Sequence, residues 1–303
     1  MTTTTTTTGL AIGVVGLGHM GGAMADRLLA AGHVVCGTSR TRGRAETLIA
    51  HGLRWMDTPH AVAHAADVII TSIPDDDTLR TVASGPDGVL AGLRAGTTWL
   101  EMSTVSPAAS RELAACVQKS NAALLDAPVS GSVPQVQAGT LSIMVGGDAD
   151  AYDCVEPVLR ELGTPTHVGT NGQGLVLKLS INISLAVQML AFAEGLQLAT
   201  QSGIEPELAL EVMANSPIGS PMLKARAPLV FDLPDEAWFT LGLVKKDVEL
   251  ARTVAQGLGL PLPTADRADE VLRLAHDLGY ERRDLAAFFR VLQEMARGRA
   301  NLA

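Results

Sequence analysis

The sequence Ala11-Ile-Gly-Val-Val15 leads directly into Gly16-Leu17-Gly18-His19-Met20-Gly21, and helix-forming residues follow as far as position 31. This order predicts a strand, a glycine-rich turn and a helix. Gly16 permits the tight turn, Gly18 leaves room for a pyrophosphate beside the backbone, and Gly21 lets the helix pack closely on the strand. The helix N-terminus offers free N–H groups to phosphate. A GxGxxG pattern alone can be a plain turn, but the flanking elements favour dinucleotide binding at residues 16–21.

The second expected strand, residues 33–38, ends in Ser39-Arg40-Thr41, and no acidic residue follows before Glu46. A site for NAD usually places a carboxylate here, where it accepts a hydrogen bond from the ribose 2′-hydroxyl. Arg40 can instead pair with the 2′-phosphate of NADP, with the Ser39 and Thr41 hydroxyls as further donors. The alternative is a solvated arginine-rich loop. The sequence predicts NADP as the cofactor, with NADPH preferred over NADH.

β-Prone and helical segments alternate as far as residue 169, which predicts a Rossmann domain over residues 10–169. Its sheet should be mainly parallel and covered on both faces. Ligands of such sheets lie beyond the carboxyl ends of the strands, which would place Pro74, Thr104 and the loop 128–131 around one crevice with the glycine turn. The expected strands are 11–15, 33–38, 66–73, 98–102, 122–126 and 141–145, and the expected helices between them are 59–65, 76–84, 107–120 and 150–161.

Strand signals nearly vanish after Gly169 and helical periodicity takes over. The predicted fold class is therefore α/β, with an N-terminal Rossmann domain followed by an all-α domain over residues 170–303 and a long helix between them. We expect the helical domain to contribute to substrate binding and dimerisation, and we expect the threonine-rich residues 1–9 to be a disordered tail. The expected helices are 172–202, 206–214, 221–231, 240–258, 264–278 and 282–298.

The apolar run from Leu175 to Ala199 has nearly the length of a membrane span. Polar residues that would be costly in lipid interrupt it, namely Lys178, Asn182, Gln188, Glu194 and Gln197. The run therefore predicts a helix buried by protein rather than a membrane helix. Apolar residues surround most of this helix, and a small helical domain does not easily bury so many of them. We therefore expect a second subunit to cover part of the helix, in a homodimer or homotetramer.

Lys178 and Asn182 are four residues apart and share one face of this helix. Their neighbours are largely apolar, so the lysine loses solvation, which favours the neutral amine and makes proton transfer near neutral pH possible. The alternative is a lysine whose stem packs along a core helix while its amine reaches solvent, with an incidental asparagine beside it.

Composition narrows the classes of partner. The net charge is −9 over 303 residues, which argues against nucleic-acid binding through a general basic surface but leaves anionic small molecules possible. The apolar fraction of 47% suffices for two sizeable cores. Three widely separated cysteines show neither a disulfide framework nor a metal-binding spacing, which favours the reducing cytoplasm.

Four separated stretches together resemble one family, the β-hydroxyacid dehydrogenases, which include 3-hydroxyisobutyrate dehydrogenase, tartronate semialdehyde reductase and glyoxylate/succinic semialdehyde reductase. The resemblance covers essentially residues 10–298. It rests on the Gly-Leu-Gly-His-Met-Gly-Gly turn, on Asp126-Ala-Pro-Val-Ser130-Gly131 with the residues up to Gly139-Thr-Leu, on Gly172-Gln-Gly174 followed by Lys178 and Asn182, and on Phe239 followed by Lys246-Asp247.

The resemblance implies a role for each of these residues. Lys178 would be the general acid/base, and Asn182 would position it and the substrate. The loop Ser130-Gly131-Ser132 would grip a substrate carboxylate through hydroxyl and backbone N–H groups. Thr104 would lie near the nicotinamide, Lys246 would contact the cofactor, and Asp247 would order the site. A turn hydroxyl at Ser130 and a surface charge pair at Lys246-Asp247 are the alternatives.

The chain departs from the family pattern in its substrate loop and in its cofactor loop. The loop reads Ser130-Gly131-Ser132-Val-Pro134 where the family commonly has Ser-Gly-Gly, which is similar to the glyoxylate/succinic semialdehyde branch. Ser39-Arg40 replaces a frequent Asn-Arg. We expect NADP(H)-dependent interconversion of a short β-hydroxy acid and its semialdehyde, or reduction of a small carboxylated aldehyde. An imine or other carbonyl reductase on the same fold, and a non-catalytic NADP-binding scaffold, are the alternatives; Lys178 counts against both.

Overall fold

The computed structural model describes residues 10–298, and the chain divides into two compact units at Lys178/Leu179. The tail expected at residues 1–9 lies outside the described residues. The sequence placed the boundary at residues 169/170, just before the long helix α9 (Gln173–Gln201), whereas the two units divide inside this continuous helix.

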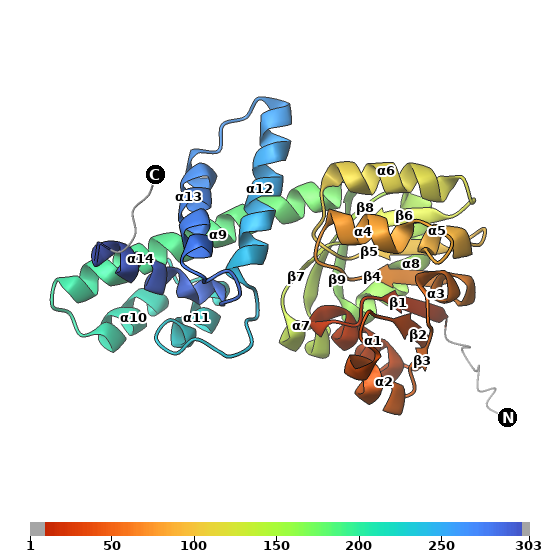
Figure 1. Ribbon diagram of the computed structural model, residues 1–303, viewed down its shortest axis with the longest axis horizontal. Helices are drawn as coiled ribbons and strands as arrows, with labels where there is room; N and C mark the ends of the chain where they lie inside the picture. Colours follow the sequence, from red (N-terminus) through yellow and green to blue (C-terminus); the bar gives the residue numbers. More distant parts are fainter. Residues whose placement is uncertain (1–9, 299–303) are drawn as a thin grey trace. The chain divides into compact units, whose positions relative to one another are not determined.

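The first unit is built on one sheet (Figure 1). Its strand order is β3-β2-β1-β4-β5-β6-β8-β7, with β9 paired to β8. The strands from β3 to β6 are parallel, whereas β8 runs antiparallel to β6 and β7 antiparallel to β8. The bounds are β1 Ala11–Val15, β2 Val34–Thr38, β3 Arg54–Trp55, β4 Val68–Thr71, β5 Thr98–Glu101, β6 Ala123–Asp126, β7 Val129–Ser130, β8 Leu141–Gly146 and β9 Gly163–Gly169.

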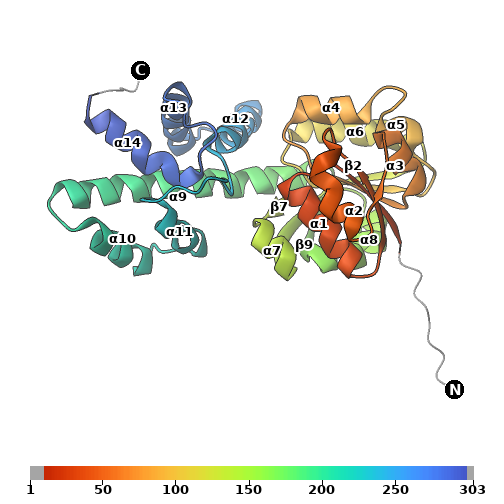
Figure 2. The same ribbon diagram turned by 60° about the horizontal axis from the view of Figure 1, so that its bottom comes forward.

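Helices cover both faces of this sheet, as Figure 2 shows. One apolar core lies between the sheet and α1, α2 and α8, and the other lies on the side of α3, α4 and α6. The central strands are buried throughout because they are covered on both faces. The helix bounds are α1 His19–Ala30, α2 Glu46–Ala50, α3 Pro59–Ala65, α4 Asp76–Ala83, α5 Val89–Gly92, α6 Pro107–Gln118, α7 Val133–Ala138 and α8 Ala149–Leu162.

Among its described residues, the second unit has helices and 3-10 turns but no strand. Its core gathers Phe192 of α9, Val244 of α12, Leu272 of α13 and Phe288 of α14. α12 and α13 lie side by side (Figures 1 and 2). The bounds are α10 Pro206–Asn215, α11 Pro221–Arg226, α12 Leu241–Leu258, α13 Pro263–Asp277 and α14 Phe288–Ala296.

The predicted fold class is confirmed, and two predicted helices were too long. The helix expected at 221–231 ends at Arg226, and a 3-10 turn containing Pro228 follows at Ala227–Leu229, because proline has no N–H to continue the helix. The helix expected at 282–298 begins at Phe288. Before it, the side chain of Asp284 accepts a hydrogen bond from the Ala286 amide and caps a 3-10 turn instead.

Helix α9 is long and apolar enough to cross a membrane by length and composition alone. Its second half, however, supplies Ala186, Met189, Phe192, Ala193 and Leu196 to the core of the helical unit. This half of the apolar run is therefore part of a protein core, whereas Leu177 and Leu198 of the same helix are exposed.

Candidate active site

The glycine turn between β1 and α1 is shaped by close backbone approaches. Gly16 has a φ of +98°, and a Cβ there would lie 2.3 Å from the carbonyl oxygen of Ser72. A Cβ on Gly21 would lie 2.0 Å from the carbonyl oxygen of Gly16. Both positions therefore exclude a side chain. Gly18 differs, because a Cβ there would meet no described atom within 4 Å. The packing of the chain does not require Gly18, so the open space beside it fits a ligand that approaches the backbone.

The N-terminus of α1 differs from those of other helices on the same sheet. α3, α4, α6 and α8 are capped by the side chains of Thr58, Asp75, Ser106 and Asp148, respectively. α1 begins after Gly18 with no side-chain cap and no acidic residue in its first turn. Its first N–H groups and positive dipole end are therefore left for an anion. Residues 16–21 fit a dinucleotide pyrophosphate.

The predicted 2′-phosphate loop follows β2. Arg40 is exposed, and Ser39 is half-buried. The neighbouring Arg42 lies over the ring of Trp55, 5.6 Å from its centroid, a cation–π contact that holds the far side of this loop on β3. This leaves Arg40 at the carboxyl end of β2, where a Rossmann sheet binds the adenosine ribose.

A buried carboxyl group organises the ends of β4 and β5. Glu101 accepts hydrogen bonds from the Thr71 hydroxyl and, at 2.9 Å, from the Ser103 amide. The Ser103 hydroxyl in turn accepts a hydrogen bond from the Ile73 amide at 2.8 Å. Glu101 thereby fixes the segments that carry the predicted residues Pro74 and Thr104. Desolvation raises the pKa of Glu101 to about 7, although the hydrogen bonds from Ser103 and Thr71 oppose the shift.

The predicted carboxylate loop lies between β7 and α7. Gly131 has a φ of +134°, a conformation that favours glycine. The Ser132 amide and hydroxyl both donate to Oε1 of Gln135, at 2.9 and 2.8 Å, and close the first turn of α7. Ser132 thus serves its own helix, which leaves Ser130 and the Gly131 amide as the better candidates for a carboxylate. At the other end of α7, Arg27 donates to the carbonyls of Gln137 and Glu161.

The first turn of α9 is held by Asp126, at the end of β6. Its Oδ1 accepts from the Gly172 amide at 2.7 Å, and its Oδ2 accepts from the Leu175 amide at 3.1 Å. Gly172 has a φ of +90° and no side chain with which to cap the helix itself. Charge-assisted hydrogen bonds of this kind contribute about 1.5–3 kcal/mol each. Desolvation nevertheless raises the pKa of Asp126, against the effect of these two amides. Asp126 belongs to one of the motifs that carry the family resemblance, but its role as a helix cap depends on the fold and is not visible in the sequence.

In the helical unit, Asn182 and Asp247 form a buried pair. Nδ2 of Asn182 donates to Oδ2 of Asp247 at 2.5 Å, and Nζ of Lys246 lies 2.9 Å from Oδ1 of Asp247. Asn182 is 1% and Asp247 2% exposed. Oδ1 of Asn182 has no hydrogen-bond partner among the described residues. A buried amide oxygen without a partner is unfavourable unless a ligand donates to it.

The predicted site residues fall in both units. Residues 16–21, Ser39 to Thr41, Pro74, Thr104 and the loop 130–132 belong to the first. Asn182, Lys246 and Asp247 belong to the second. Lys178 is the last residue of the first unit, is buried, and stands one helical turn before Asn182 on the continuous helix α9.

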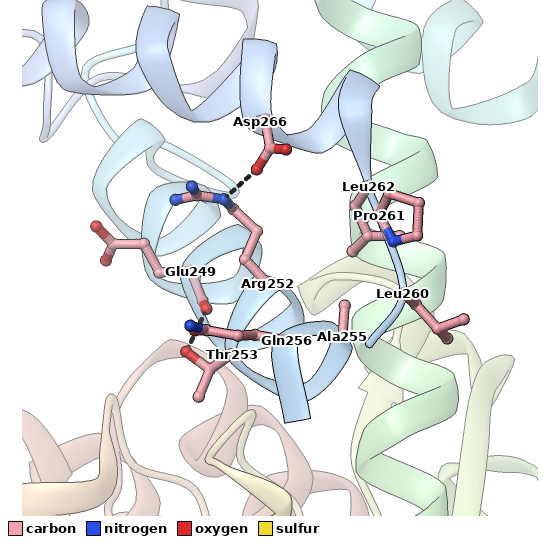
Figure 3. Close-up of a pocket in the computed structure, with 9 residues that line it drawn as sticks. All are labelled: Glu249, Arg252, Thr253, Ala255, Gln256, Leu260, Pro261, Leu262 and Asp266. Atoms are coloured by element: carbon pink, nitrogen blue, oxygen red, sulfur yellow. Dashed lines mark hydrogen bonds and ion pairs between the residues drawn. The ribbon is translucent and has the colours of Figure 1, made fainter. Parts of the chain in front are cut away.

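A separate pocket of about 490 Å³ lies between α12 and α13 in the helical unit (Figure 3). Arg252 is among the residues that line it, and this arginine forms ion pairs with Asp266 and Asp269. None of the predicted site residues lines it. Within residues 10–298, no group of His, Cys, Asp and Glu side chains has the arrangement of a metal site.

Comparison with known proteins finds a matching family for each half of the chain. Residues 11–172 match the family described as the NAD binding domain of 6-phosphogluconate dehydrogenase. Residues 172–292 match the family described as NAD-binding of NADP-dependent 3-hydroxyisobutyrate dehydrogenase. The 2-(hydroxymethyl)glutarate dehydrogenase of Eubacterium barkeri is 33% identical over 286 residues, which cover 94% of this chain and 95% of that protein.

Solved structures agree with this assignment. A 3-hydroxyisobutyrate dehydrogenase from Salmonella typhimurium has a TM-score of 0.86 at 27% identity, covering 93% of this chain and 99% of the other. An imine reductase from a Pseudomonas species has a TM-score of 0.62 at 24% identity, covering 94% and 99%, which shows a shared fold only. The chain therefore belongs to the β-hydroxyacid dehydrogenase family and is an NAD(P)-dependent oxidoreductase that acts on hydroxyl groups.

Proposed function

We propose that this protein interconverts a short β-hydroxy acid and its semialdehyde, or reduces another small carboxylated aldehyde, with NADP(H), and that Lys178 is the acid/base. The observation that carries the proposal is the pair of buried polar residues on one face of α9, Lys178 and Asn182, in an otherwise apolar helix. A structural lysine and asparagine would not need to be buried together, one turn apart.

The proton step follows from the chemistry of an amine. In the direction of reduction, the Lys178 ammonium donates a proton to the oxygen of the former carbonyl group. In the direction of oxidation, the neutral amine removes the proton of the substrate hydroxyl. A bound nicotinamide supplies the hydride in the first direction and accepts it in the second. Asp247 fixes the orientation of the Asn182 amide, so that Oδ1 of Asn182 is available to a donor such as the substrate hydroxyl.

The substrate is proposed to carry a carboxylate. Ser130 and the Gly131 amide follow β6 at the end of the sheet where ligands bind, and an N–H with a hydroxyl suits one carboxylate oxygen. The names of two relatives support the same class, because 2-(hydroxymethyl)glutarate and 3-hydroxyisobutyrate both place a primary alcohol on the carbon β to a carboxylate.

NADP is the proposed cofactor, with NADPH preferred over NADH. The exposed guanidinium of Arg40 stands at the carboxyl end of β2, and the residues that follow β2 offer no carboxylate to a ribose 2′-hydroxyl before Glu46.

We further propose a homodimer or homotetramer. A cytoplasmic location is proposed because Cys36, Cys116 and Cys154 are free thiols.

A substrate panel read by NADPH absorbance tests the proposal. Succinic semialdehyde and glyoxylate should be reduced, 3-hydroxyisobutyrate should be oxidised, and the methyl ester of each acid should react at a far lower kcat/KM. A neutral aldehyde of matching size is the control for general carbonyl reduction, and a cyclic imine is the control for imine reduction. Equal rates for acid and ester, or a preference for the imine, would overturn the carboxylated substrate.

A further inference from the structure

The buried aspartate that begins the Asp126-Ala-Pro-Val motif is the strongest unexplained feature of the first unit. Asp126 is 0% exposed, and it carries no role in binding or proton transfer in the function proposed above. A carboxylate in such a position is unfavourable unless its oxygens are satisfied. Its oxygens accept hydrogen bonds from two amides of one segment, Gly172 and Leu175, at 2.7 and 3.1 Å. The Ser110 hydroxyl approaches more weakly, at 3.4 Å.

The fit around this carboxylate is close on both sides of the helix start. A Cβ on Gly174 would lie 2.5 Å from the Met144 carbonyl oxygen and 2.9 Å from Oδ2 of Asp126. A Cβ on Gly146 would lie 2.8 Å from the same Oδ2 and 2.7 Å from the Thr170 carbonyl oxygen. Glycines at both positions let the first turn of α9 sit directly against the end of the sheet. The first turn therefore has little freedom to shift along it.

Lys178 follows this anchored turn by one further turn of the same helix. Leu175, whose amide is bonded to Asp126, is three residues before Lys178, so the two lie on adjacent turns of one helical face. Leu175 is itself fully buried in the core on the α6 side of the sheet. A rigid helix transmits the position of its first turn to its second, and an acid/base acts only within hydrogen-bond reach of its substrate.

We propose that Asp126 is a positioning residue for Lys178: it anchors the first turn of α9 on the end of β6 and thereby sets where the lysine amine stands. The proposal rests on Lys178 being the acid/base of the proposed function. It predicts that Asp126 acts on the chemical step through Lys178 and has no direct part in cofactor binding.

The test is a double-mutant cycle of Asp126→Asn and Lys178→Met, measured with succinic semialdehyde and NADPH. Asparagine keeps the shape but removes the charge and one acceptor oxygen. The Asp126→Asn kcat should fall on the order of tenfold to a hundredfold, because a small misplacement of a reacting group has effects of this size. The dissociation constant for NADPH should stay within about twofold, since residues 16–21 are untouched. The pH profile of kcat should also lose or shift the limb that Lys178→Met abolishes.

The cycle separates this proposal from the proposed function. In the Lys178→Met background, adding Asp126→Asn should lower kcat by less than about twofold, because the group it positions is gone. Equal losses in both backgrounds would overturn the positioning role alone. Near-wild-type turnover of the Lys178→Met single variant would overturn the proposed function, and the positioning role with it.

Two further variants keep the result interpretable. Asp148→Asn changes an exposed carboxylate that caps α8 through the Ala151 amide at 2.9 Å, and should leave kcat near the wild-type value. If Asp126→Asn does not fold, Gly174→Ala tests the positioning role instead. Its Cβ would collide with the Met144 carbonyl oxygen and displace the same turn, while the Asp126 carboxylate is kept. A fall in kcat with unchanged NADPH binding supports the proposal, and an unchanged kcat in folded Gly174→Ala overturns it.

Discussion

The side-chain amide of Asn182 donates to Oδ2 of Asp247 across 2.5 Å, which joins α9 to α12 over a sequence separation of 65 residues. Both side chains are almost completely buried. Asp247 also lies 2.9 Å from Nζ of Lys246. One buried carboxylate thus orients the Asn182 amide and forms an ion pair with Lys246, and the family resemblance implies that both partners belong to the active site.

Replacement of Asp247 by alanine should impair turnover more than folding. The change removes the acceptor that orients Asn182, so we expect kcat to fall about tenfold or more, with a loss of stability of about 1–3 kcal/mol from the unsatisfied amide. Steady-state kinetics and denaturant unfolding measure the two effects. Asp269→Ala is the matched control, because Asp269 is 1% exposed and pairs with Arg252 and Arg273 in the same unit. A similar fall in kcat for both variants would show that Asp247 acts only through stability.

Cofactor selectivity should depend on Arg40. The wild-type protein should favour NADPH over NADH, and Arg40→Ala should remove most of this preference. A lost charge-assisted contact of about 1.5–3 kcal/mol corresponds to roughly tenfold to over a hundredfold in selectivity. The ratio of kcat/KM for the two cofactors gives the answer, with Arg44→Ala, at an exposed arginine nearby, as the control for general positive charge. Equal use of NADPH and NADH by the wild type would contradict the assignment.

The glycine turn, α1 and α9 could be predicted because their signals are local. The β1 and α1 boundaries follow from a β-prone run, three spaced glycines and a helical composition within 20 residues or so of each other. β9 was missed because its sequence, which includes Gly163, Pro165 and Gly169, has the composition of turns. It is a strand only because it pairs with β8 along almost its whole length. β3 and β7 are two residues long and carry no periodicity at all.

The site was predictable where a residue type indicates its chemistry, and it was not where the role depends on a distant partner. Lys178 and Asn182 could be paired because four residues separate them on one helix. The cap from Asp126 could not, because the amides it binds lie 46 and 49 residues later in the chain. The role of Glu101 in holding Ser103 likewise depends on strands that meet only in the folded sheet.

Glu101 should make the stability of the protein depend on pH. Its pKa rises from 4.5 to about 7 on folding, so the folded state binds more protons than the unfolded state between these values. The free energy of unfolding should therefore fall as the pH rises through this window. Glu101→Gln lacks the effect, and its stability relative to the wild type should increase by roughly 2–3 kcal/mol between about pH 5 and 8. Urea unfolding of both proteins measures this difference, and a difference independent of pH would contradict it.

Assembly should bury the apolar surface that α9 and α10 expose. Leu198 is 71%, Val212 61% and Leu208 53% exposed. We expect light scattering at micromolar concentration to give the mass of a dimer or tetramer, and Leu198→Asp with Val212→Lys to shift it toward the monomer. Val34→Lys, at an exposed apolar residue of the first unit, is the control. A stable wild-type species of 31.6 kDa would reject this prediction.

The most direct test of the proposed mechanism is the turnover of Lys178→Met. Methionine keeps the apolar stem but removes the amine, so folding and NADPH binding should survive. The neighbouring Leu177→Met controls for disturbance of the helix, and should turn over like the wild type. For Lys178→Met we predict that kcat falls by about 10²–10⁴, the usual contribution of a positioned acid/base. Normal NADPH binding with turnover within a few-fold of the wild type would contradict acid/base catalysis by Lys178.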